Sequence, residues 1–369
     1  MKMQQTNNTP SDRVLSIDFF RGLTMLLLMI ESTGLYYYLI SPQLQGTLIY
    51  AIGKNFHHHP WHGLNFWDLI QPFFMFIVGV SMYLSYQNRL KKGDSYEAIR
   101  KHILIRSLLL LFLGWWLYCM SHGRISFYFQ NVLAQLAVTT LISFLIIRKP
   151  VLTQIIISIA LLGISELLYR TFWIDGYNQP FVAGRNFGTW VDTLINGVDK
   201  DGFWASFNAI PTTAHTIWGV LAAKLLMGSK SQKRKLLVLV IAGIACLLIG
   251  YGLDPVTPII KRIATSTFVF TSGGWTLLML AFSFWVIDIL QVRRGLIIFS
   301  AVGMNSLFIY LFFSVGGNTI CNQIGLPFSK LVFSWAGELT VYIFASLIAA
   351  FLMWYLCYWM YKQRIFIKI

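Results

Sequence analysis

Charged side chains are scarce in this sequence of 369 residues. Asp, Glu, Lys and Arg make up 12% of the chain, whereas soluble domains carry about 25%. Hydrophobic residues account for 56%, and apolar runs of about 20 residues recur from one end of the chain to the other. This deficit of charge excludes a large soluble core and predicts an all-α integral membrane protein that crosses the bilayer many times.

Cysteine and acidic residues are also few. The four cysteines, Cys119, Cys246, Cys321 and Cys357, form no Cys-x-x-Cys pair and no Cys/His spacing typical of a metal site. We expect them to be small buried hydrophobes, so no disulfide framework is predicted. The 14 acidic residues are outnumbered by 29 Lys and Arg, which gives a net charge of +15. Because most of these cations stand in short loops between apolar runs, they indicate membrane orientation, and no nucleic-acid partner is expected.

Ten apolar segments are long enough to be membrane-spanning helices, and we expect one polytopic domain over residues 1–369. The segments are 14–40, 66–88, 101–120, 130–148, 151–172, 205–228, 233–252, 260–287, 295–316 and 337–362. The first is too long and too charged for a cleavable signal peptide, so we expect it to be retained as the first span.

The loops between these segments alternate in charge. Basic clusters occur at Arg89/Lys91/Lys92/Arg100/Lys101, Arg148/Lys149, Lys230/Lys233/Arg234/Lys235, Arg293/Arg294 and Lys362/Arg364/Lys368. The positive-inside rule therefore predicts that both termini, including the tail 1–13, are cytoplasmic. The long segment 173–204 and the histidine-rich run that begins at His57 are predicted to face outward.

Polar residues interrupt several apolar segments, where each charge costs at least about 2.5–3.5 kcal/mol and needs a partner or a function. Asp18 and Arg21 are one helical turn apart, so they either pair at the cytoplasmic edge or hold an anionic ligand. Glu31 either lines a cavity or lies at the outer interface. Further polar residues of this kind are Ser32, Asp68, Gln71, Asn208, His215, Lys261, Arg262, Asn305 and Ser306. Together they indicate a water-filled cavity between the helices.

Four of the seven histidines gather just before the second apolar segment, at positions 57, 58, 59 and 62. Pro60 favours a short helix that begins near His59. If that helix is continuous, Trp61, Asn65 and Asp68 share one of its faces. The sequence thus predicts imidazoles and a carboxylate close together at the outer edge of the membrane.

Three chemistries are compatible with this cluster. A zinc site needs three or four ligands, and His58 and His62 have an i, i+4 spacing, but no cysteine supports such a site. A proton-coupled transporter would use His and Asp as proton relays. Acyl transfer needs a base or nucleophile with a pKa near neutrality, which His supplies, and a carboxylate such as Asp68 to fix its tautomer. The residues alone favour acyl transfer and leave open which histidine acts.

At these residues the sequence resembles the heparan-α-glucosaminide N-acetyltransferase family and its bacterial relatives, which are multi-pass acyltransferases. The resemblance is carried by SIDFFRG at 16–22 and HHPWHGLNFWDLIQPFFMFIVG at 58–79, and more weakly by the segments 199–219, 258–274 and 303–310. It implies that His58 is the active histidine and that Asp68 is its acidic partner. It also implies acetyl-CoA from the cytosol as the donor, and an amino-sugar or glycan acceptor on the outer side.

The sequence also departs from the family pattern. Ser32 stands where the animal enzymes have an asparagine near the active site, and Glu31 is an unexpected neighbour. The large N-terminal lumenal region of the animal enzymes is expected to be absent. These departures bear on the identity of the acceptor more than on the reaction.

The expected function is therefore a transmembrane N-acetyltransferase of the bacterial inner membrane, with its active histidine toward the periplasm. The alternative is a proton-coupled solute transporter that uses the same His58–Asp68 pair. The expected partners are acetyl-CoA, a glucosamine-type sugar or glycan, the lipid bilayer and, in a homodimer, a second copy of the chain. No metal is expected. The segment 173–204 is predicted to be either a platform for the acceptor or an ordinary interfacial loop.

In the expected mechanism His58 either deprotonates the acceptor or is transiently acetylated, while Asp68 orients it. Trp61 forms an apolar wall. Asn305 or Ser306 is expected to donate hydrogen bonds to the developing oxyanion. The candidates for binding the CoA phosphates are Arg21, Lys261 and Arg262, and the other candidate ligand-binding residues are Asp18, Glu31, Ser32, Asn208 and His215. Arg21 and Lys261 are predicted to lie at opposite faces of the membrane.

Overall fold

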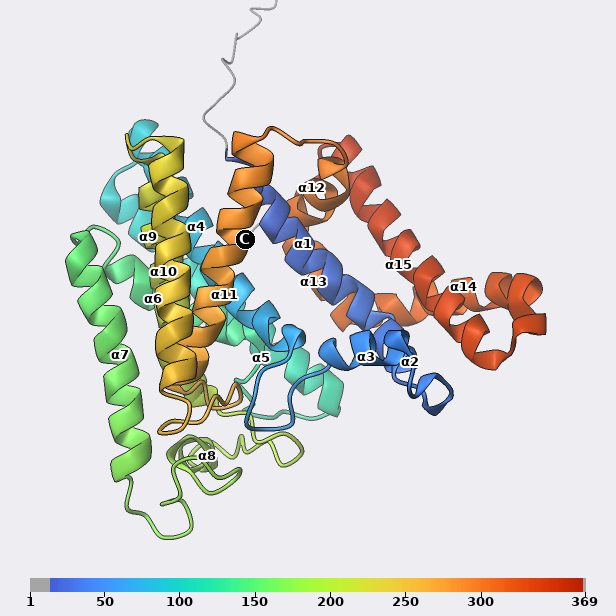
Figure 1. Ribbon diagram of the computed structural model, residues 1–369, viewed down its shortest axis with the longest axis horizontal. Coiled ribbons are helices and arrows are strands. Elements are labelled where there is room, and N and C mark those ends of the chain that lie inside the picture. The colour runs from blue at the N-terminus through green and yellow to red at the C-terminus, as the bar shows by residue number, and fades with distance from the viewer. Residues whose placement is uncertain (1–13, 368–369) are drawn as a thin grey trace, which may run out of the picture.

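The computed structural model describes residues 14–367, and the elements within that range are helical (Figure 1). The α-helices are α1 (Leu15–Ser32), α2 (Leu35–Leu39), α3 (Leu48–Asn55), α4 (Ile70–Lys91), α5 (Tyr96–His122), α6 (Val132–Leu145), α7 (Val151–Thr171), α8 (Phe187–Thr193), α9 (Ala209–Met227), α10 (Gln232–Gly252), α11 (Ser266–Phe284), α12 (Leu296–Met304), α13 (Ser306–Ser314), α14 (Gly317–Phe333) and α15 (Glu338–Lys362). Short helical turns are η1 (Pro42–Leu44), η2 (Phe66–Leu69), η3 (Ser206–Asn208), η4 (Trp285–Ile289) and η5 (Ser334–Ala336). The tail 1–13, predicted to be cytoplasmic, lies outside the described residues.

Six helical stretches are long and apolar enough to cross a membrane, and the pair α12–α13 makes a seventh if it is counted as one span. The six are Phe66–Lys91, Tyr96–His122, Val151–Thr171, Gln232–Gly252, Ser266–Ile289 and Glu338–Lys362. This composition and length identify an all-helical, multi-pass membrane protein. Each of the ten predicted segments contains a helix, but the count of ten spans and the cytoplasmic termini stay predictions.

Three of the predicted segments are not single straight helices. The segment 14–40 divides at Gly34, whose φ of +83° ends one helix and begins the next. The segment 260–287 becomes helical only at Ser266, which leaves its first residues in an irregular loop. The ninth segment bends by 71° at Asn305, between α12 and α13. Each departure places polar side chains at a break between helices.

No predicted segment covers α14, which forms a hairpin with α15 at one side of the molecule (Figure 1). Polar residues and Pro327 make this helix less apolar than a typical span. Two of those polar residues have a structural role, because Asn318 and Asn322 donate to the backbone carbonyls of Ser32 and Thr33, at 2.7 and 3.1 Å. They satisfy carbonyl groups that the end of α1 leaves without helical partners.

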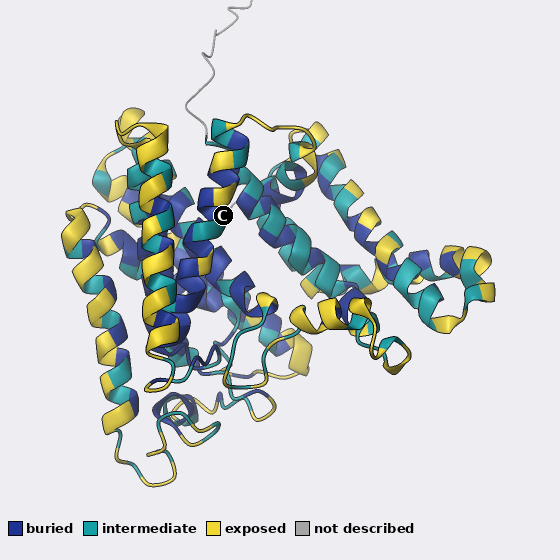
Figure 2. Ribbon diagram, in the orientation of Figure 1, coloured by how far each residue is buried: buried dark blue, intermediate teal, exposed yellow. Residues whose placement is uncertain are grey.

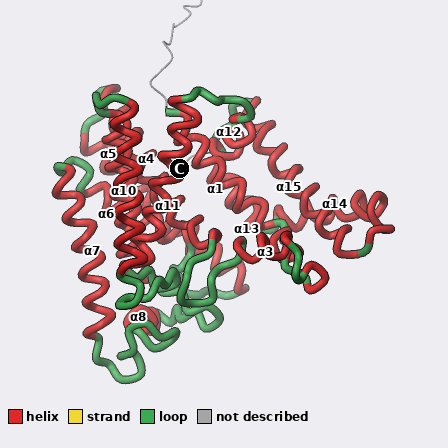
Figure 3. The backbone as a smooth tube through the Cα atoms, in the orientation of Figure 1, coloured by secondary structure: helices red, strands yellow, loops and turns green. Residues whose placement is uncertain are grey.

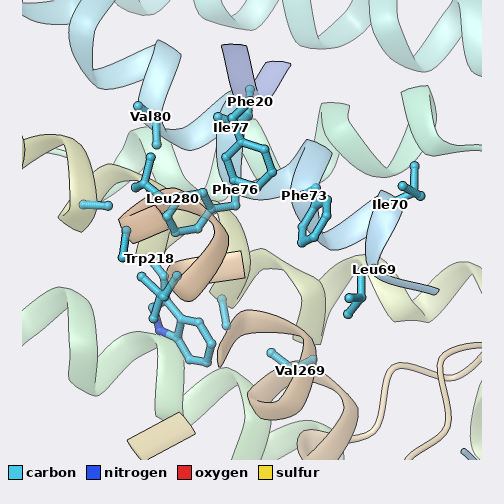
Figure 4. Close-up of a cluster of buried hydrophobic side chains, with 14 of the residues drawn as sticks. Phe20, Leu69, Ile70, Phe73, Phe76, Ile77, Val80, Trp218, Val269 and Leu280 are labelled. Carbon is cyan, nitrogen blue, oxygen red and sulfur yellow. The ribbon is translucent and has the colours of Figure 1, made fainter. Parts of the chain in front are cut away.

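The core lies where α4, α9 and α11 pack against α1. Figure 4 draws Phe20, Phe73, Phe76, Trp218 and Leu280 in this cluster. The helices α4 and α9 approach closely because Gly79 lies on the backbone of Thr216, and Gly219 lies on the backbone of α4. A Cβ atom at either glycine would overlap a carbonyl oxygen of the facing helix. This packing fixes the start of α4, and with it Asp68.

The outer helices expose apolar side chains instead. Figure 2 shows exposed residues along α7 and α10, whereas α4 and α11 are largely buried. The exposed side chains of α7 and α10 include Ile155, Ile156, Ile159, Ile241, Ile244 and Leu248. An apolar surface of this kind is stable in contact with lipid.

Irregular segments gather at one end of the bundle (Figure 3). They are 56–65, 123–131, 172–208 and 253–265, of which 172–208 includes α8 and η3. Backbone hydrogen bonds join these loops, from Gly63 to the carbonyl of Ile259 at 2.9 Å and from Ala205 to that of Arg262 at 3.0 Å. We call this end of the molecule the loop layer. It carries the candidate site.

Candidate active site

The carboxylate of Asp68 contacts both the start of η2 and the side chain of His58. The run 56–65 is not helical, so the predicted helix that begins near His59 is wrong, and η2 begins only after Asn65, which caps it. Asp68 Oδ2 accepts from the backbone N–H groups of Asn65 at 2.9 Å and of His59 at 3.1 Å. Its Oδ1 lies 2.9 Å from His58 Nδ1. The carboxylate is only 1% exposed, so the loop and the helix end together fix its position.

This contact decides which nitrogen of His58 is free. A carboxylate only accepts hydrogen bonds, so Nδ1 of His58 donates to Asp68 and Nε2 keeps its lone pair. The His58 side chain is 36% exposed. The ring is therefore oriented by one nitrogen and accessible to a ligand through the other.

Lys261 completes a cluster of three charged or titratable groups. Its Nζ lies 3.1 Å from His58 Nδ1 and 3.7 Å from Asp68 Oδ1, and its side chain is 6% exposed. Burial and the positive charge of Lys261 lower the pKa of His58 to about 4, although Asp68 opposes the shift. Burial also lowers the pKa of Lys261 itself, to about 8. At neutral pH His58 is thus an uncharged imidazole beside a mostly protonated lysine.

Two cavities meet at His58. The first cavity measures about 270 Å³ and is lined by Leu28, Glu31, His58, Trp67, Ile70, Gln71, Phe74, Tyr118, Gln130, Asn131, Val132, Gln135, Trp204, Lys261 and Tyr310. The second cavity measures about 220 Å³ and is lined by Glu31, Tyr36, Tyr37, Phe56, His57, His58 and Trp67. The residues common to both are Glu31, His58 and Trp67. Glu31 Oε1 accepts from Trp67 Nε1 at 2.9 Å, so this pair lies at the junction with His58.

Amides and phenols form the polar wall of the first cavity. Gln71 donates to Gln135, and Gln135 Nε2 donates in turn to Asn208 Oδ1 at 2.5 Å. Asn131 Nδ2 donates to the Tyr310 hydroxyl at 3.4 Å. Asn208 is fully buried behind this wall, so the predicted ligand-binding residue supports the cavity and does not line it. Tyr310 accepts one bond here and still has a proton to donate.

Trp204 packs against His58 from the loop layer. Its ring meets the imidazole edge-on with centroids 5.3 Å apart, and Lys261 Nζ lies 5.4 Å from its centroid. The predicted apolar wall, Trp61, lines neither cavity; its Nε1 donates to the carbonyl of Phe181 at 2.7 Å. Trp61 thus anchors the loop 173–204, and Trp204 provides the aromatic wall.

The sequence of the chain matches a family of known proteins. The family model described as heparan-alpha-glucosaminide N-acetyltransferase, catalytic, matches residues 13–253. The chain belongs to the heparan-alpha-glucosaminide N-acetyltransferase family. This confirms the resemblance found in the sequence. The match contains His58 and Asp68 and ends before Lys261 and Tyr310.

Two curated members of the heparan-alpha-glucosaminide N-acetyltransferase family match almost the whole chain. The protein of that name from Homo sapiens is 25% identical over 428 residues, which cover 97% of this chain and 60% of the human protein. The protein of the same name from Mus musculus is 24% identical over 437 residues, which cover 99% of this chain and 62% of the mouse protein. The chain therefore spans about three fifths of the length of these relatives.

Two predicted residues of this N-acetyltransferase family member, Asn305 and Ser306, line neither cavity. Asn305 is buried, donates to the carbonyl of Ile365 at 3.1 Å and accepts from the N–H of Ile367 at 3.3 Å. Ser306 follows it at the start of α13. The bend between α12 and α13 directs Asn305 to the C-terminal segment, and neither residue lines a cavity, so the structure does not support the oxyanion role predicted for them.

Other predicted residues lie along α1 and between α9 and α11. Asp18 is in the first turn of α1, and Arg21 Nη2 donates to Ser81 Oγ at 2.5 Å. The Ser32 hydroxyl donates to the carbonyl of Met29, one turn back in its own helix. His215 is fully buried, and its Nε2 lies 3.0 Å from Ser272 Oγ. Neither cavity is lined by Asp18, Arg21, Ser32 or His215.

The zinc interpretation depends on His58 and His62, and the structure separates them. His62 Nε2 lies 2.9 Å from Asp254 Oδ1, at the exposed edge of the loop layer, whereas His58 contacts Asp68. Because residues 56–65 form a loop, the i, i+4 spacing does not place the two rings on one helix face. Among residues 14–367, no group of three or more His, Cys, Asp or Glu side chains is arranged to hold a metal ion.

Proposed function

We propose that this protein transfers the acetyl group of acetyl-CoA to an amino-sugar or glycan acceptor, and that His58 carries out the transfer. The proposal rests on one observation above all: an imidazole oriented by a buried carboxylate lines both cavities. The printed name of the human and mouse relatives, heparan-alpha-glucosaminide N-acetyltransferase, supports the choice of acetyl transfer and of an amino-sugar acceptor.

Nε2 of His58 is the proposed reactive atom. It either attacks the thioester carbon and carries the acetyl group, or takes a proton from the acceptor as the acceptor attacks. In both routes the imidazole gains positive charge, which Asp68 Oδ1 at 2.9 Å stabilises. The lowered pKa of His58 keeps the ring unprotonated between reactions.

The first cavity is the proposed site for the acetyl-bearing end of the donor. Pockets for whole small molecules measure about 300–1,000 Å³. A volume of about 270 Å³ therefore suits the thioester and the adjoining arm, while the nucleotide end of the donor lies outside it. The Tyr310 hydroxyl, which accepts from Asn131, is positioned to donate to the carbonyl oxygen as charge develops. Lys261 adds a positive charge to the same wall.

We further propose that His58 faces the periplasm of a bacterial inner membrane, in a chain with ten spans and cytoplasmic termini. The stretch Phe66–Lys91 begins beside the His58–Asp68 pair and ends in the basic cluster. The positive-inside rule assigns that end to the cytoplasm. The residues of α1, α4 and α5 that line the first cavity lie at the loop-layer ends of these helices, so in this orientation a cytosolic donor has to reach the cavity from the opposite side of the bilayer.

Sidedness is testable with a membrane-impermeant maleimide on intact cells. Asp175 and Lys230 are exposed in different loops, and each is replaced by cysteine. We expect Asp175→Cys to be labelled from outside and Lys230→Cys only after lysis. The reverse pattern contradicts the proposed orientation.

The activity itself is tested with purified protein, labelled acetyl-CoA and glucosamine. We expect label to appear in N-acetylglucosamine. His102→Ala serves as a control, because His102 is exposed on α5 and lies about 24 Å along that helix from Tyr118, at about 1.5 Å per residue. Proton-driven uptake of a solute by proteoliposomes, with no transfer of label, would favour the transporter instead.

A further inference from the structure

Glu31 is a carboxylate at the junction of the two cavities, and the mechanism above gives it no task. It lies in the last turn of α1, lines both cavities and accepts a hydrogen bond from Trp67 through Oε1. Among the residues that the structure describes, no cation forms an ion pair with it; the nearest positive influence is the electrostatic field of Lys261. A carboxylate in such a position is costly unless it serves a ligand.

The two cavities differ in charge and in the kind of side chain that lines them. The first cavity includes Lys261 and a wall of amides. Within residues 14–367, no Lys or Arg lines the second cavity, and its lining outside the shared residues consists of Tyr36, Tyr37, Phe56 and His57. An anionic molecule such as acetyl-CoA is therefore better placed in the first cavity. The second cavity presents the carboxyl group of Glu31 and aromatic rings, and a cation that binds there favours the ionised carboxylate.

The aromatic rings of the second cavity form a continuous surface. The rings of Tyr36 and Phe56 have centroids 4.5 Å apart, and those of Tyr36 and Trp67 are 5.1 Å apart. Tyr37, at 66% exposed, lies against His57 and marks an open side of the cavity. Such faces bind flat apolar surfaces, including the C–H face of a sugar ring, while one polar group sets the orientation.

We propose that the second cavity is the acceptor subsite and that Glu31 binds the protonated amino group of the acceptor and takes one of its protons, so that the protein selects amines over hydroxyl acceptors. Loss of this proton frees the nitrogen lone pair to attack the acetyl carbon, and the bond from that carbon to the CoA sulfur or to His58 Nε2 breaks as the new C–N bond forms. This inference rests on the proposed function, because it assigns the acceptor to one side of His58 and the donor to the other. A cationic amino sugar fits the subsite in both respects: its ammonium pairs with Glu31, and its ring lies on the aromatic surface. His58 borders both cavities and is within reach of both reactants.

Glu31→Gln is the direct test, since the amide oxygen still accepts from Trp67 Nε1 and only the charge is lost. Hydrogen bonds to charged groups contribute about 1.5–3 kcal/mol. We therefore expect the KM for glucosamine to rise about tenfold to a hundredfold. The KM for acetyl-CoA is expected to stay unchanged. Glu97→Gln is the matched control, because Glu97 is an exposed carboxylate paired with Arg100 on α5.

A binding measurement separates this inference from the proposed activity. Calorimetry on wild-type protein is expected to give tighter binding of glucosamine than of uncharged N-acetylglucosamine, and Glu31→Gln is expected to abolish the difference. Tyr37→Ala provides a second variant at the exposed side, and it is expected to weaken the binding of both sugars without changing the KM for acetyl-CoA.

Two results would contradict the role proposed for Glu31, and a third would contradict the proposed acetyl transfer alone. An unchanged preference for glucosamine in Glu31→Gln contradicts the assignment of Glu31. A rise in the KM for acetyl-CoA alone places Glu31 in the donor site and also contradicts it. If wild-type protein binds glucosamine through Glu31 but transfers no acetyl group, the proposed function is wrong and the subsite stands.

Discussion

Polar side chains lie in apolar surroundings at both ends of the helix bundle, but their partners differ. In the loop layer, the side chains of His58, Asp68 and Lys261 contact one another beside two cavities. At the other end, Asp288 accepts from two backbone N–H groups at the start of α1, at 3.0 and 3.1 Å. Asn305, at the bend between α12 and α13, likewise bonds to backbone groups of the C-terminal segment.

The difference separates structural from functional polar groups in a membrane protein. Asp288 and Asn305 satisfy backbone groups that helix ends and bends leave without partners, and this is sufficient reason for them to be there. His58 and Lys261 are held by side chains and border a cavity, so their presence calls for a ligand. Asp68 has a structural and a functional contact, because Oδ2 accepts from the backbone N–H at the start of η2 and Oδ1 contacts His58.

Asp68→Asn breaks the functional cluster, and we expect it to have the largest effect of the changes described here. Loss of the charge that stabilises the imidazolium is expected to lower kcat about 100- to 10,000-fold. Asn65→Ala is the control, because it removes the bond from Asn65 Nδ2 to the carbonyl of His57 at 2.9 Å and leaves both the His58–Asp68 contact and the backbone N–H that donates to Asp68; it is expected to cost stability of about 1 kcal/mol. Equal losses of kcat in the two variants would mean that Asp68 serves only to hold the loop. The measurement is steady-state acetyl transfer, with thermal unfolding alongside.

Tyr310→Phe and Asn305→Ala compare the two kinds of polar group within one short segment. Tyr310 lines the first cavity, and removal of one oxyanion donor lowers kcat about 100- to 1,000-fold. We expect that loss for Tyr310→Phe and an unchanged kcat for Asn305→Ala. The opposite result in the same acetyl-transfer assay would restore the oxyanion role to Asn305.

Lys261→Met sharpens the electrostatic part of the account. Activity requires the uncharged form of His58, so it is lost as pH falls through the pKa of His58, which burial and Lys261 lower to about 4. Without the lysine, we expect the acidic limb of kcat/KM to move upward, toward the ordinary value of about 6.5, while burial keeps part of the shift. Arg262→Met is expected to move the limb less, because Arg262 makes the smallest contribution to the pKa of His58. An acidic limb at the same pH in Lys261→Met and wild type contradicts this assignment.

Asp288→Ala tests the structural end and has the smallest expected effect. Loss of the acceptor for Leu15 and Ser16 is comparable to loss of a helix cap, at about 0.5–2 kcal/mol. We expect a lower midpoint of thermal unfolding and an unchanged kcat. A large fall in kcat without loss of stability would show that this end of the bundle also takes part in the reaction.

The fold class could be predicted from the sequence because the thickness of the bilayer dictates the length of apolar runs. The breaks between helices, such as the one after α1, could not be predicted, because they depend on hydrogen bonds between segments far apart in the chain. The carbonyls at the end of α1 are satisfied by asparagines of α14, far along the chain. Because α14 carries these asparagines and Pro327, its sequence did not resemble that of a membrane-spanning helix.

The site was predicted only in part. The resemblance to a family paired His58 with Asp68, and the distance of 2.9 Å is consistent with that pairing. Trp204 and Tyr310 stand in quoted segments, yet nothing in their local sequence indicates that they line a cavity together with His58. The face shared by Trp61 and Asp68 and the single span 295–316 were both predicted on the assumption of continuous helices. The loop 56–65 and the bend after α12 make that assumption wrong.

The central claim is that His58, and no other histidine, carries the acetyl transfer. The most direct measurement is the rate of label transfer from acetyl-CoA to glucosamine by His58→Ala, beside His102→Ala and wild type. Loss of a positioned acid–base group lowers the rate about 100- to 10,000-fold. The account predicts a loss in that range for His58→Ala and a wild-type rate for His102→Ala. Transfer by His58→Ala at the wild-type rate would contradict it.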